Sequence, residues 1–170
     1  HGSGKLDEGV KIEEGGDMQF VPDERVSHGD IIDGGNWSVE CVYTPGHTSN
    51  HVCFQLKEGR ILFTGDHVMG WSTSIVSPPD GDMEAYMNSL DLLLERDDRV
   101  YWPTHGPAVT EPKEHVTAFI AHRREREKQI LKCVDEGVHI ISEMVPKMYQ
   151  GTPEFMFPAA ARSVFAAVEY

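Results

Sequence analysis

The segment ILFTGD, residues 61–66, decides the fold class of this chain. Its first four residues form a short apolar run with β-branched and aromatic members, which predicts a strand that is buried on both faces. Gly65 imposes a turn, and Asp66 follows directly after the predicted strand end. Ligands of layered α/β proteins bind beyond such strand ends, so Asp66 is a candidate site residue.

Two further segments repeat this layout. YTPGHT (residues 43–48) and VYWPTHG (residues 100–106) each join a strand-like run to a glycine-containing turn and a histidine, His47 or His105. We expect His47, Asp66 and His105 to lie close together at one edge of the sheet. Two imidazoles and a carboxylate form a donor set that suits zinc, iron or manganese.

The patterns around these segments predict an α/β protein. Residues 37–43 alternate with a period of two, which indicates a strand whose more buried face carries Trp37 and its odd-numbered neighbours. Further strands are expected at 51–56 and 100–102, and short strands and turns between residues 10 and 32. A helix is expected from Met83 to Leu94, with Tyr86, Leu90, Leu93 and Leu94 buried. A long helix is expected to start at a cap at Thr110, with Pro112 in its first turn, and to end at Gly137. Two more helices are expected, one around residues 140–149 and one from about residue 158 onward.

The motifs Thr44–Thr48, Thr64–Asp66 and Pro103–Pro107, in this order, resemble the later metal-binding motifs of the metallo-β-lactamase superfamily. Residues 122–131 resemble the helix that opens the C-terminal winged-helix-like domain of the lactamase-beta-2-like branch. The resemblance implies part of an αββα metallo-β-lactamase sandwich, followed by an incomplete winged-helix-like helical domain. The corresponding division is residues 1–121, the C-terminal part of the metallo-β-lactamase-like domain, and residues 122–170, the partial helical domain.

The resemblance also implies a binuclear metal site with a metal-bound hydroxide as nucleophile. His47 is then a ligand of the first ion, His105 a ligand of the second, and Asp66 the catalytic residue that bridges both. Two zinc ions are expected in the full-length parent, with iron or manganese as alternatives. Near these ligands, His67, Ser72 and Thr73 are candidates for the substrate pocket. Alternatively, His67 hydrogen-bonds beside a metal ligand, and Ser72 and Thr73 form part of a turn.

One family motif is absent from these 170 residues, namely two histidines separated by one residue and followed by an adjacent Asp-His pair. Three ligands shared between two ions fall below the three per ion that catalytic zinc sites have. We therefore expect an internal fragment that lacks the N-terminal half of the sandwich and the C-terminal wing. Taken alone, this chain is expected to be inactive and to hold metal loosely.

Composition narrows the functions that remain. The formal net charge of −13 disfavours nonspecific nucleic-acid binding. The basic residues at 123, 124, 126 and 128 alternate with Glu125 and Glu127, which predicts a solvated helix face with ion pairs. No apolar run is long enough for a membrane helix and no signal peptide is recognisable, so a cytoplasmic protein is expected. Cys41, Cys53 and Cys133 are predicted to be buried free thiols.

The leading hypothesis is a parent protein that is a metal-dependent hydrolase of a small ester or thioester. The second hypothesis is a phosphodiesterase or ribonuclease of the same fold. A non-catalytic scaffold, whose helical unit binds a partner, is the third. The expected partners are a small-molecule substrate and a second copy of the chain in a homodimer, with the helical unit as a packing or dimerisation element.

Overall fold

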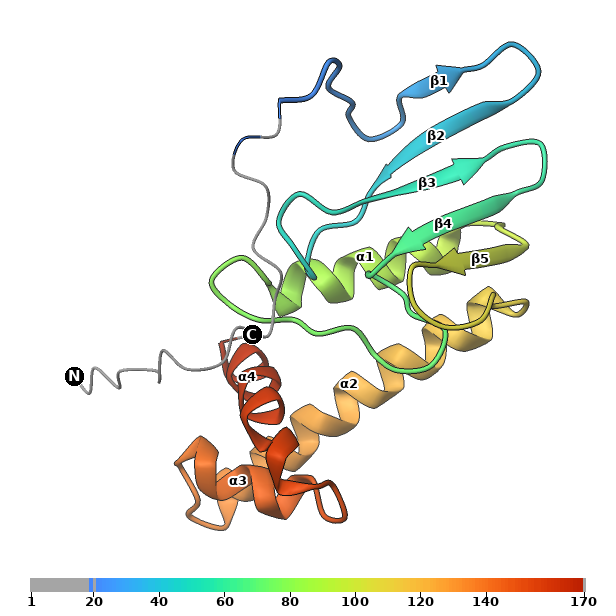
Figure 1. The fold of residues 1–170 in the computed structure, drawn as a ribbon. Helices are drawn as coiled ribbons and strands as arrows, with labels where there is room; N and C mark the ends of the chain where they lie inside the picture. The colour runs from blue at the N-terminus through green and yellow to red at the C-terminus, as the bar shows by residue number, and fades with distance from the viewer. Residues whose placement is uncertain (1–18, 20, 170) are drawn as a thin grey trace.

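The computed structural model describes residue 19 and residues 21–169. Five strands form one sheet in the order β1-β2-β3-β4-β5 (Figure 1). The first four strands pair antiparallel, and β5 pairs parallel to β4 after the chain crosses over through helix α1. The strands are β1 (Ile31–Asp33), β2 (Ser38–Tyr43), β3 (Val52–Leu56), β4 (Ile61–Gly65) and β5 (Val100–Pro103), and α1 is Met83–Glu95.

Helix α2 starts beside the sheet, and its far end meets the two remaining α-helices (Figure 1). Helix α2 (Pro112–Asp135) contacts α1 near its start and reaches α3 (Ile141–Met148) and α4 (Phe157–Val168) near its end (Figure 1). A short 3-10 helix, η1 (Glu154–Met156), precedes α4. Among the residues described, no helix combines the length and the apolar character that crossing a bilayer requires. The predicted strands before residue 19 lie outside the described residues.

The core lies between α1, α2 and one face of the sheet. Val42 pairs with Cys53 and Leu62 pairs with Tyr101, and all four side chains are buried against the helices. In β2 the more buried face was expected to carry Trp37, but Trp37 is 45% exposed and Val42 is fully buried. The prediction holds for Cys41, which is fully buried, and is wrong for Trp37, which precedes the strand, and for Tyr43, which is 44% exposed. Burial does not alternate along β2, because Cys41 and Val42 are adjacent and both are fully buried.

The opposite face of the sheet is partly exposed. Phe63 is 38% exposed and Trp102 is 51% exposed, and their rings meet edge to face with centroids 5.9 Å apart. The prediction that β4 is buried on both faces is therefore wrong for the described residues, in which helices cover one face only. One sheet layer and one helix layer correspond to half of an αββα sandwich.

Helix α1 begins where the sequence predicts. The Asp82 carboxylate accepts the Ala85 backbone N–H at 2.7 Å and caps the first turn. Tyr86, Leu90 and Leu93 are buried as expected, and Leu94 is half-buried against the same core.

Helix α2 differs from its prediction in two respects. Its N-cap is Glu111 rather than Thr110, because Pro112 occupies the first helical turn, and Gly137 follows the helix at a φ of +80°. The predicted ion-paired face is also wrong for Arg123, which is buried with its guanidinium carbon 5.3 Å from the centroid of the Tyr86 ring.

The far end of α2 contributes to a second hydrophobic cluster. Ile130 and Cys133 pack there against α3 and α4 through Met144, Val145 and Val164. The predicted domain boundary between residues 121 and 122 falls inside this continuous helix. The division into two domains stays a prediction, and the winged-helix-like character of the helical unit is not confirmed.

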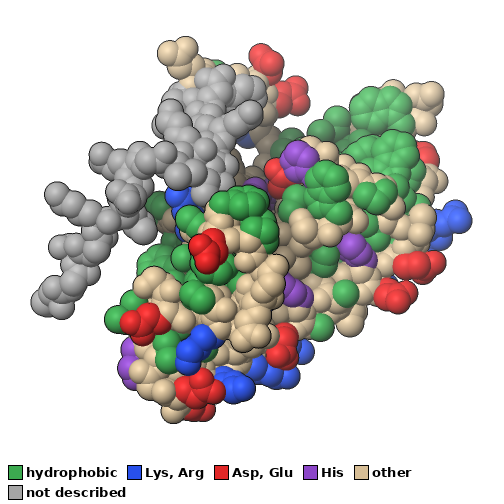
Figure 2. Space-filling model, turned by 60° about the horizontal axis from the view of Figure 1, so that its bottom comes forward, with side chains coloured by type: hydrophobic (Ala, Val, Ile, Leu, Met, Phe, Trp, Pro, Cys, Tyr) green, Lys and Arg blue, Asp and Glu red, His purple; other side chains and the backbone are tan. Residues whose placement is uncertain are grey.

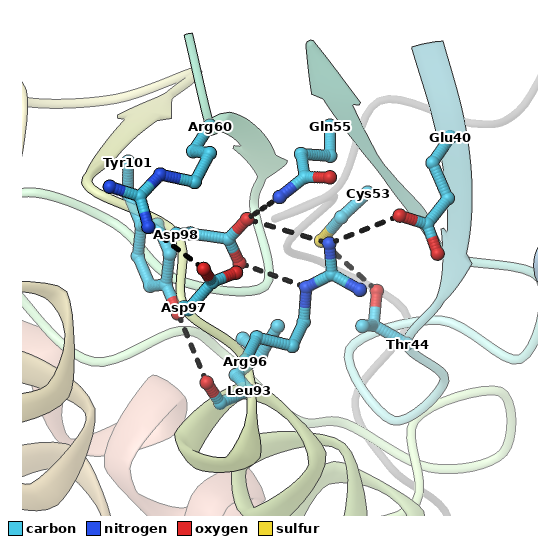
Figure 3. A network of polar contacts seen from close by, with 10 residues as sticks. All are labelled: Glu40, Thr44, Cys53, Gln55, Arg60, Leu93, Arg96, Asp97, Asp98 and Tyr101. Atoms are coloured by element: carbon cyan, nitrogen blue, oxygen red, sulfur yellow. Dashed lines mark hydrogen bonds and ion pairs between the residues drawn. The ribbon is translucent and has the colours of Figure 1, made fainter. Parts of the chain in front are cut away.

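A buried polar network joins the end of α1 to the middle of the sheet (Figure 3). Arg96 donates to the buried Asp98 carboxylate at 2.8 Å and approaches Glu40 of β2 at 3.5 Å, and Gln55 of β3 also donates to Asp98. Burial raises the pKa of the neighbouring Cys53 thiol to about 12. All three cysteines are buried and free, as predicted.

The packing of α1 leads to a stability prediction. Replacing fully buried Leu90 with alanine leaves a cavity, so we expect Leu90→Ala to lower the free energy of unfolding by about 2–5 kcal/mol. Leu131, which is 57% exposed on α2, is the matched control, and Leu131→Ala is expected to change it by less than about 0.5 kcal/mol. Urea denaturation measures both values. Equal effects of the two substitutions contradict the core assignment.

Candidate metal centre

The structure brings His47, Asp66 and His105 together at the edge of the sheet. His47 Nε2 lies 3.9 Å from Asp66 Oδ2, and His105 Nε2 lies 3.5 Å from Asp66 Oδ1. The three residues follow β2, β4 and β5 respectively. Each carboxylate oxygen therefore faces a different imidazole.

These separations are compatible with metal binding. Bonds from zinc to nitrogen or oxygen donors measure about 2.0–2.2 Å, so two donors on the same ion lie at most about 4.3 Å apart. Both nitrogen–oxygen pairs satisfy this limit. A carboxylate with one imidazole beside each oxygen is suited to bridging two ions.

Hydrogen bonds fix the orientation of the donor groups. His47 Nδ1 lies 2.6 Å from the Ile75 carbonyl oxygen, which fixes the tautomer with the proton on Nδ1 and leaves Nε2 free toward Asp66. The Thr104 hydroxyl donates to Asp66 Oδ1 at 2.8 Å. The Gly70 N–H donates to the His105 carbonyl at 2.8 Å and so ties the loop after β4 to the loop after β5.

Two glycines next to the histidines allow close backbone approaches. A Cβ at Gly46, where φ is +131°, would lie 2.3 Å from the backbone of Tyr86 in α1. A Cβ at Gly106, where φ is +94°, would lie 2.8 Å from the Cα of Gly70. Positive φ and the close contacts both require glycine at these positions.

A second layer of histidines lies under the candidate ligands. His67 is fully buried, its ring centroid lies 4.6 Å from that of Tyr86, and neither ring nitrogen has a hydrogen-bond partner among the described residues. Burial, reinforced by His51 and His47, holds the pKa of His67 well below its usual value. Burial and neighbouring His47 lower the pKa of His51 to about 4. Both rings are neutral at pH 7.

The remaining pocket candidates lie in the loop between β4 and α1. Ser72 is exposed and Thr73 is half-buried, whereas His67 has no exposed surface to present to a substrate. Contacts of these three residues with a substrate stay predictions. Figure 2 shows histidine side chains emerging among hydrophobic ones on the face that it draws.

Sequence reasoning missed two residues that support the site, Ser74 and Arg123. The buried Ser74 hydroxyl lies within hydrogen-bond distance of the Asp66 and His67 carbonyl oxygens, at 2.8 Å from the latter. Arg123 of α2 donates to the Ser74 carbonyl, and the Tyr86 hydroxyl donates to the His67 carbonyl at 2.9 Å. The sequence carried a partial signal, since Ser74 follows the two predicted pocket residues and Arg123 opens a basic run.

The types and orientation of the donor groups fit a metal site, but three side-chain ligands are too few to coordinate two ions. Within residues 21–169 no group of three or more His, Cys, Asp or Glu side chains is arranged to hold a single ion. His47 with Asp66, and His105 with Asp66, form two half-sites of two ligands each. Further ligands are needed for each ion to reach the usual coordination number.

The fold and the placement of Asp66 between two histidines are typical of layered α/β proteins that bind metal at a sheet edge. The family model described as the metallo-beta-lactamase superfamily matches residues 2–105. The chain belongs to this superfamily, whose members typically bind metal ions, and the resemblance inferred from the motifs is confirmed.

The chain is similar to several curated relatives. It is 36% identical over 131 residues to a beta-lactamase-like protein 2 homolog of Drosophila melanogaster, covering 75% of this chain and 43% of the relative. It is 30% identical over 138 residues to an atrochrysone carboxyl ACP thioesterase of Aspergillus chevalieri, covering 74% of this chain and 44% of that protein. The chain thus spans less than half the length of these relatives.

Solved structures show the same fold. A beta-lactamase domain protein from Burkholderia ambifaria superposes with a TM-score of 0.74 at 20% identity, over 87% of this chain and 47% of that one. A metallo-beta-lactamase family protein from Thermus thermophilus gives 0.73 at 20% identity, over 85% and 47%.

The free energy of unfolding tests the role of the Ser74 hydroxyl in the loop. Ser74→Ala removes the single hydroxyl proton that lies near the Asp66 and His67 carbonyls, and only the His67 carbonyl retains another side-chain donor, the Tyr86 hydroxyl. We therefore expect the free energy of unfolding to fall by about 1–3 kcal/mol. Exposed Ser72 in the same loop is the matched control, and Ser72→Ala is expected to change it by less than about 0.5 kcal/mol. Thermal and urea unfolding provide the measurement. A neutral Ser74→Ala contradicts the role assigned to its hydroxyl.

Metal affinity tests the half-sites. We expect this chain to bind zinc weakly, because each ion finds only two protein ligands. His105→Ala and Asp66→Asn are each expected to weaken binding at least tenfold, as measured by titration calorimetry in a buffer that does not bind zinc. His139, an exposed histidine before α3, is the control, and His139→Ala should leave the affinity unchanged. Tight binding that survives both substitutions contradicts the assignment.

Proposed function

We propose that the whole protein to which this chain belongs is a metal-dependent hydrolase of a thioester or a small ester. The observation that carries the proposal is the position of Asp66, whose two oxygens each face one imidazole. His47, Asp66 and His105 would each contribute to holding two metal ions, together with ligands from elsewhere in the protein. When bound, such ions supply Lewis acidity and a nucleophile that is available at neutral pH.

The chain's own residues prepare the site for this chemistry. The bond from Thr104 and the anchored backbone of Asp66 keep the carboxylate between the two histidines. The Ile75 carbonyl keeps the His47 ring in one orientation. The side chain of His105 is 56% exposed, so this side of the site is open to an incoming substrate.

Two observations favour a thioester over a polyanionic substrate. Two relatives, from Aspergillus chevalieri and Aspergillus fumigatus, carry the name atrochrysone carboxyl ACP thioesterase, and the second is 38% identical over 106 residues. The net charge of −13 repels the phosphate backbone of RNA and therefore disfavours binding of a ribonuclease substrate. Zinc is the proposed metal because nitrogen and carboxylate donors suit it, with iron and manganese as alternatives.

A comparison of hydrolysis rates tests the proposal. The whole protein is expected to hydrolyse an acyl thioester, to lose activity with a chelator, and to regain it with added zinc. Asp66→Asn should lower kcat/KM at least 100-fold because it removes the bridging charge. Exposed Glu95 at the end of α1 is the control, and Glu95→Gln should stay within about twofold of the unmodified protein. Metal-dependent cleavage of RNA without thioester turnover would favour a nuclease instead, and a metal-free inactive protein would favour a scaffold.

A further inference from the structure

A cavity separate from the metal ligands lies between α1, α2 and α4. Its volume is about 100 Å³, and its lining includes three arginines of α2, namely Arg123, Arg124 and Arg126. Apolar side chains, among them Met87 and Ile130, also line it. We call this space the arginine cavity.

Two of the three guanidinium groups have a buried Nε without a hydrogen-bond acceptor among the described residues. Arg123 is only 9% exposed, and its Nε is buried without a hydrogen-bond partner among the described residues. The Nε of Arg126 also lacks a described partner, although its Nη1 donates to the Met148 carbonyl at 2.8 Å and to Gln129 Oε1 at 2.9 Å. The Arg126 guanidinium lies 4.0 Å from the Tyr149 ring centroid. Buried cationic donors are costly unless an anion or further acceptors complete them.

Charge around the cavity favours an anion. Asp91 and Glu127 also line it, so three positive charges face two negative ones. Within the part of the chain that the structure describes, none of the three arginines approaches a carboxylate closely enough to form an ion pair, while Arg60 and Arg96 do so elsewhere. The arginines therefore provide positive charge that no described carboxylate neutralises directly.

We propose that the arginine cavity binds a small organic carboxylate, with the anionic group at Arg123 and Arg126 and a short alkyl body against Met87 and Ile130. The planar fork of a guanidinium matches a carboxylate, and the apolar wall favours an alkyl carboxylate over inorganic phosphate. An apolar cavity of about 150 Å³ accommodates benzene, so about 100 Å³ suits an anion smaller than benzene, such as propionate.

The site does not depend on the proposed hydrolase activity. It uses no metal ligand, and its arginines lie on one helix. It does touch the loop of the metal centre, because Arg123 also donates to the Ser74 carbonyl. Arg123 is therefore unsuitable for a first substitution, since its loss disturbs that loop.

Binding of propionate to this chain by nuclear magnetic resonance tests the proposal. The titration is carried out with EDTA present and at constant ionic strength, so that residual metal at Asp66 cannot hold the anion. We expect saturable shifts of the Arg123 and Arg126 Nε–Hε signals, with a Kd of about 1 mM for a ligand of this size. Phosphate should bind at least threefold more weakly, and chloride should cause no saturable shift.

Three variants distinguish binding of propionate in the arginine cavity from nonspecific attraction to surface charge. Ser163→Phe fills the cavity from α4 without altering an arginine, and Arg126→Gln removes one charge; each should weaken binding at least tenfold. Lys128→Gln, on an exposed position of the same helix, is the matched control and should leave Kd within about twofold. Circular dichroism confirms that each variant is folded.

Several results would overturn the proposal: no saturable binding of propionate, equal weakening in the Lys128→Gln control, or shifts confined to His47 and His105. Phosphate binding as tightly as propionate would overturn the choice of an organic carboxylate. Retention of binding when both Ser163→Phe and Arg126→Gln are folded would exclude this cavity as the site.

Discussion

The side chain of Ser74 anchors the loop on which the candidate metal centre depends. Its hydroxyl lies at the carbonyl oxygens of Asp66 and His67, which are the first residues after the end of β4. Because this backbone is held, the Asp66 carboxylate emerges between two imidazoles that arrive from other strand ends. Thr104 and the Gly70–His105 backbone bond then close the loop after β5 onto the loop after β4. The geometry of the ligands follows from these loop contacts and from the strand order.

Neutral histidines beneath the ligands add to this arrangement. Rings of His51 and His67 lie 5.5 Å apart between centroids, and burial keeps both uncharged. A positive charge there would oppose a metal ion bound above it, whereas neutral rings do not. His67 also fills the space beside Tyr86, whose hydroxyl donates to the His67 carbonyl. The layer under the site thus combines packing with low charge.

The sequence predicted the strands, α1 and the meeting of His47, Asp66 and His105, because strand ends and tight turns leave strong local patterns. It failed where burial depends on partners that are distant along the chain. The apolar run at β4 gave no indication that Phe63 would be exposed, since periodicity does not reveal which layers cover a sheet. The run of charges in α2 resembled a solvated face, and only the packing of α1 against α2 shows that Arg123 is buried. Ser74 follows the two predicted pocket residues, but no motif indicates that its hydroxyl would reach the Asp66 and His67 carbonyls.

Helix α2 contributes side chains to both hydrophobic clusters, as does α4 through Ala166 and Val164. Near its start, Val116, Phe119 and Ile120 belong to the core under the sheet, and near its end Ile130 and Cys133 belong to the helical cluster. Arg123 lies between these groups and is bonded to the Ser74 carbonyl. A shift of α3 and α4 that moved α2 would therefore act on the same residue that holds the Asp66 loop. The helical unit is therefore connected to the loop of the candidate metal centre through Arg123 of α2, although none of the three candidate ligands lies in that unit.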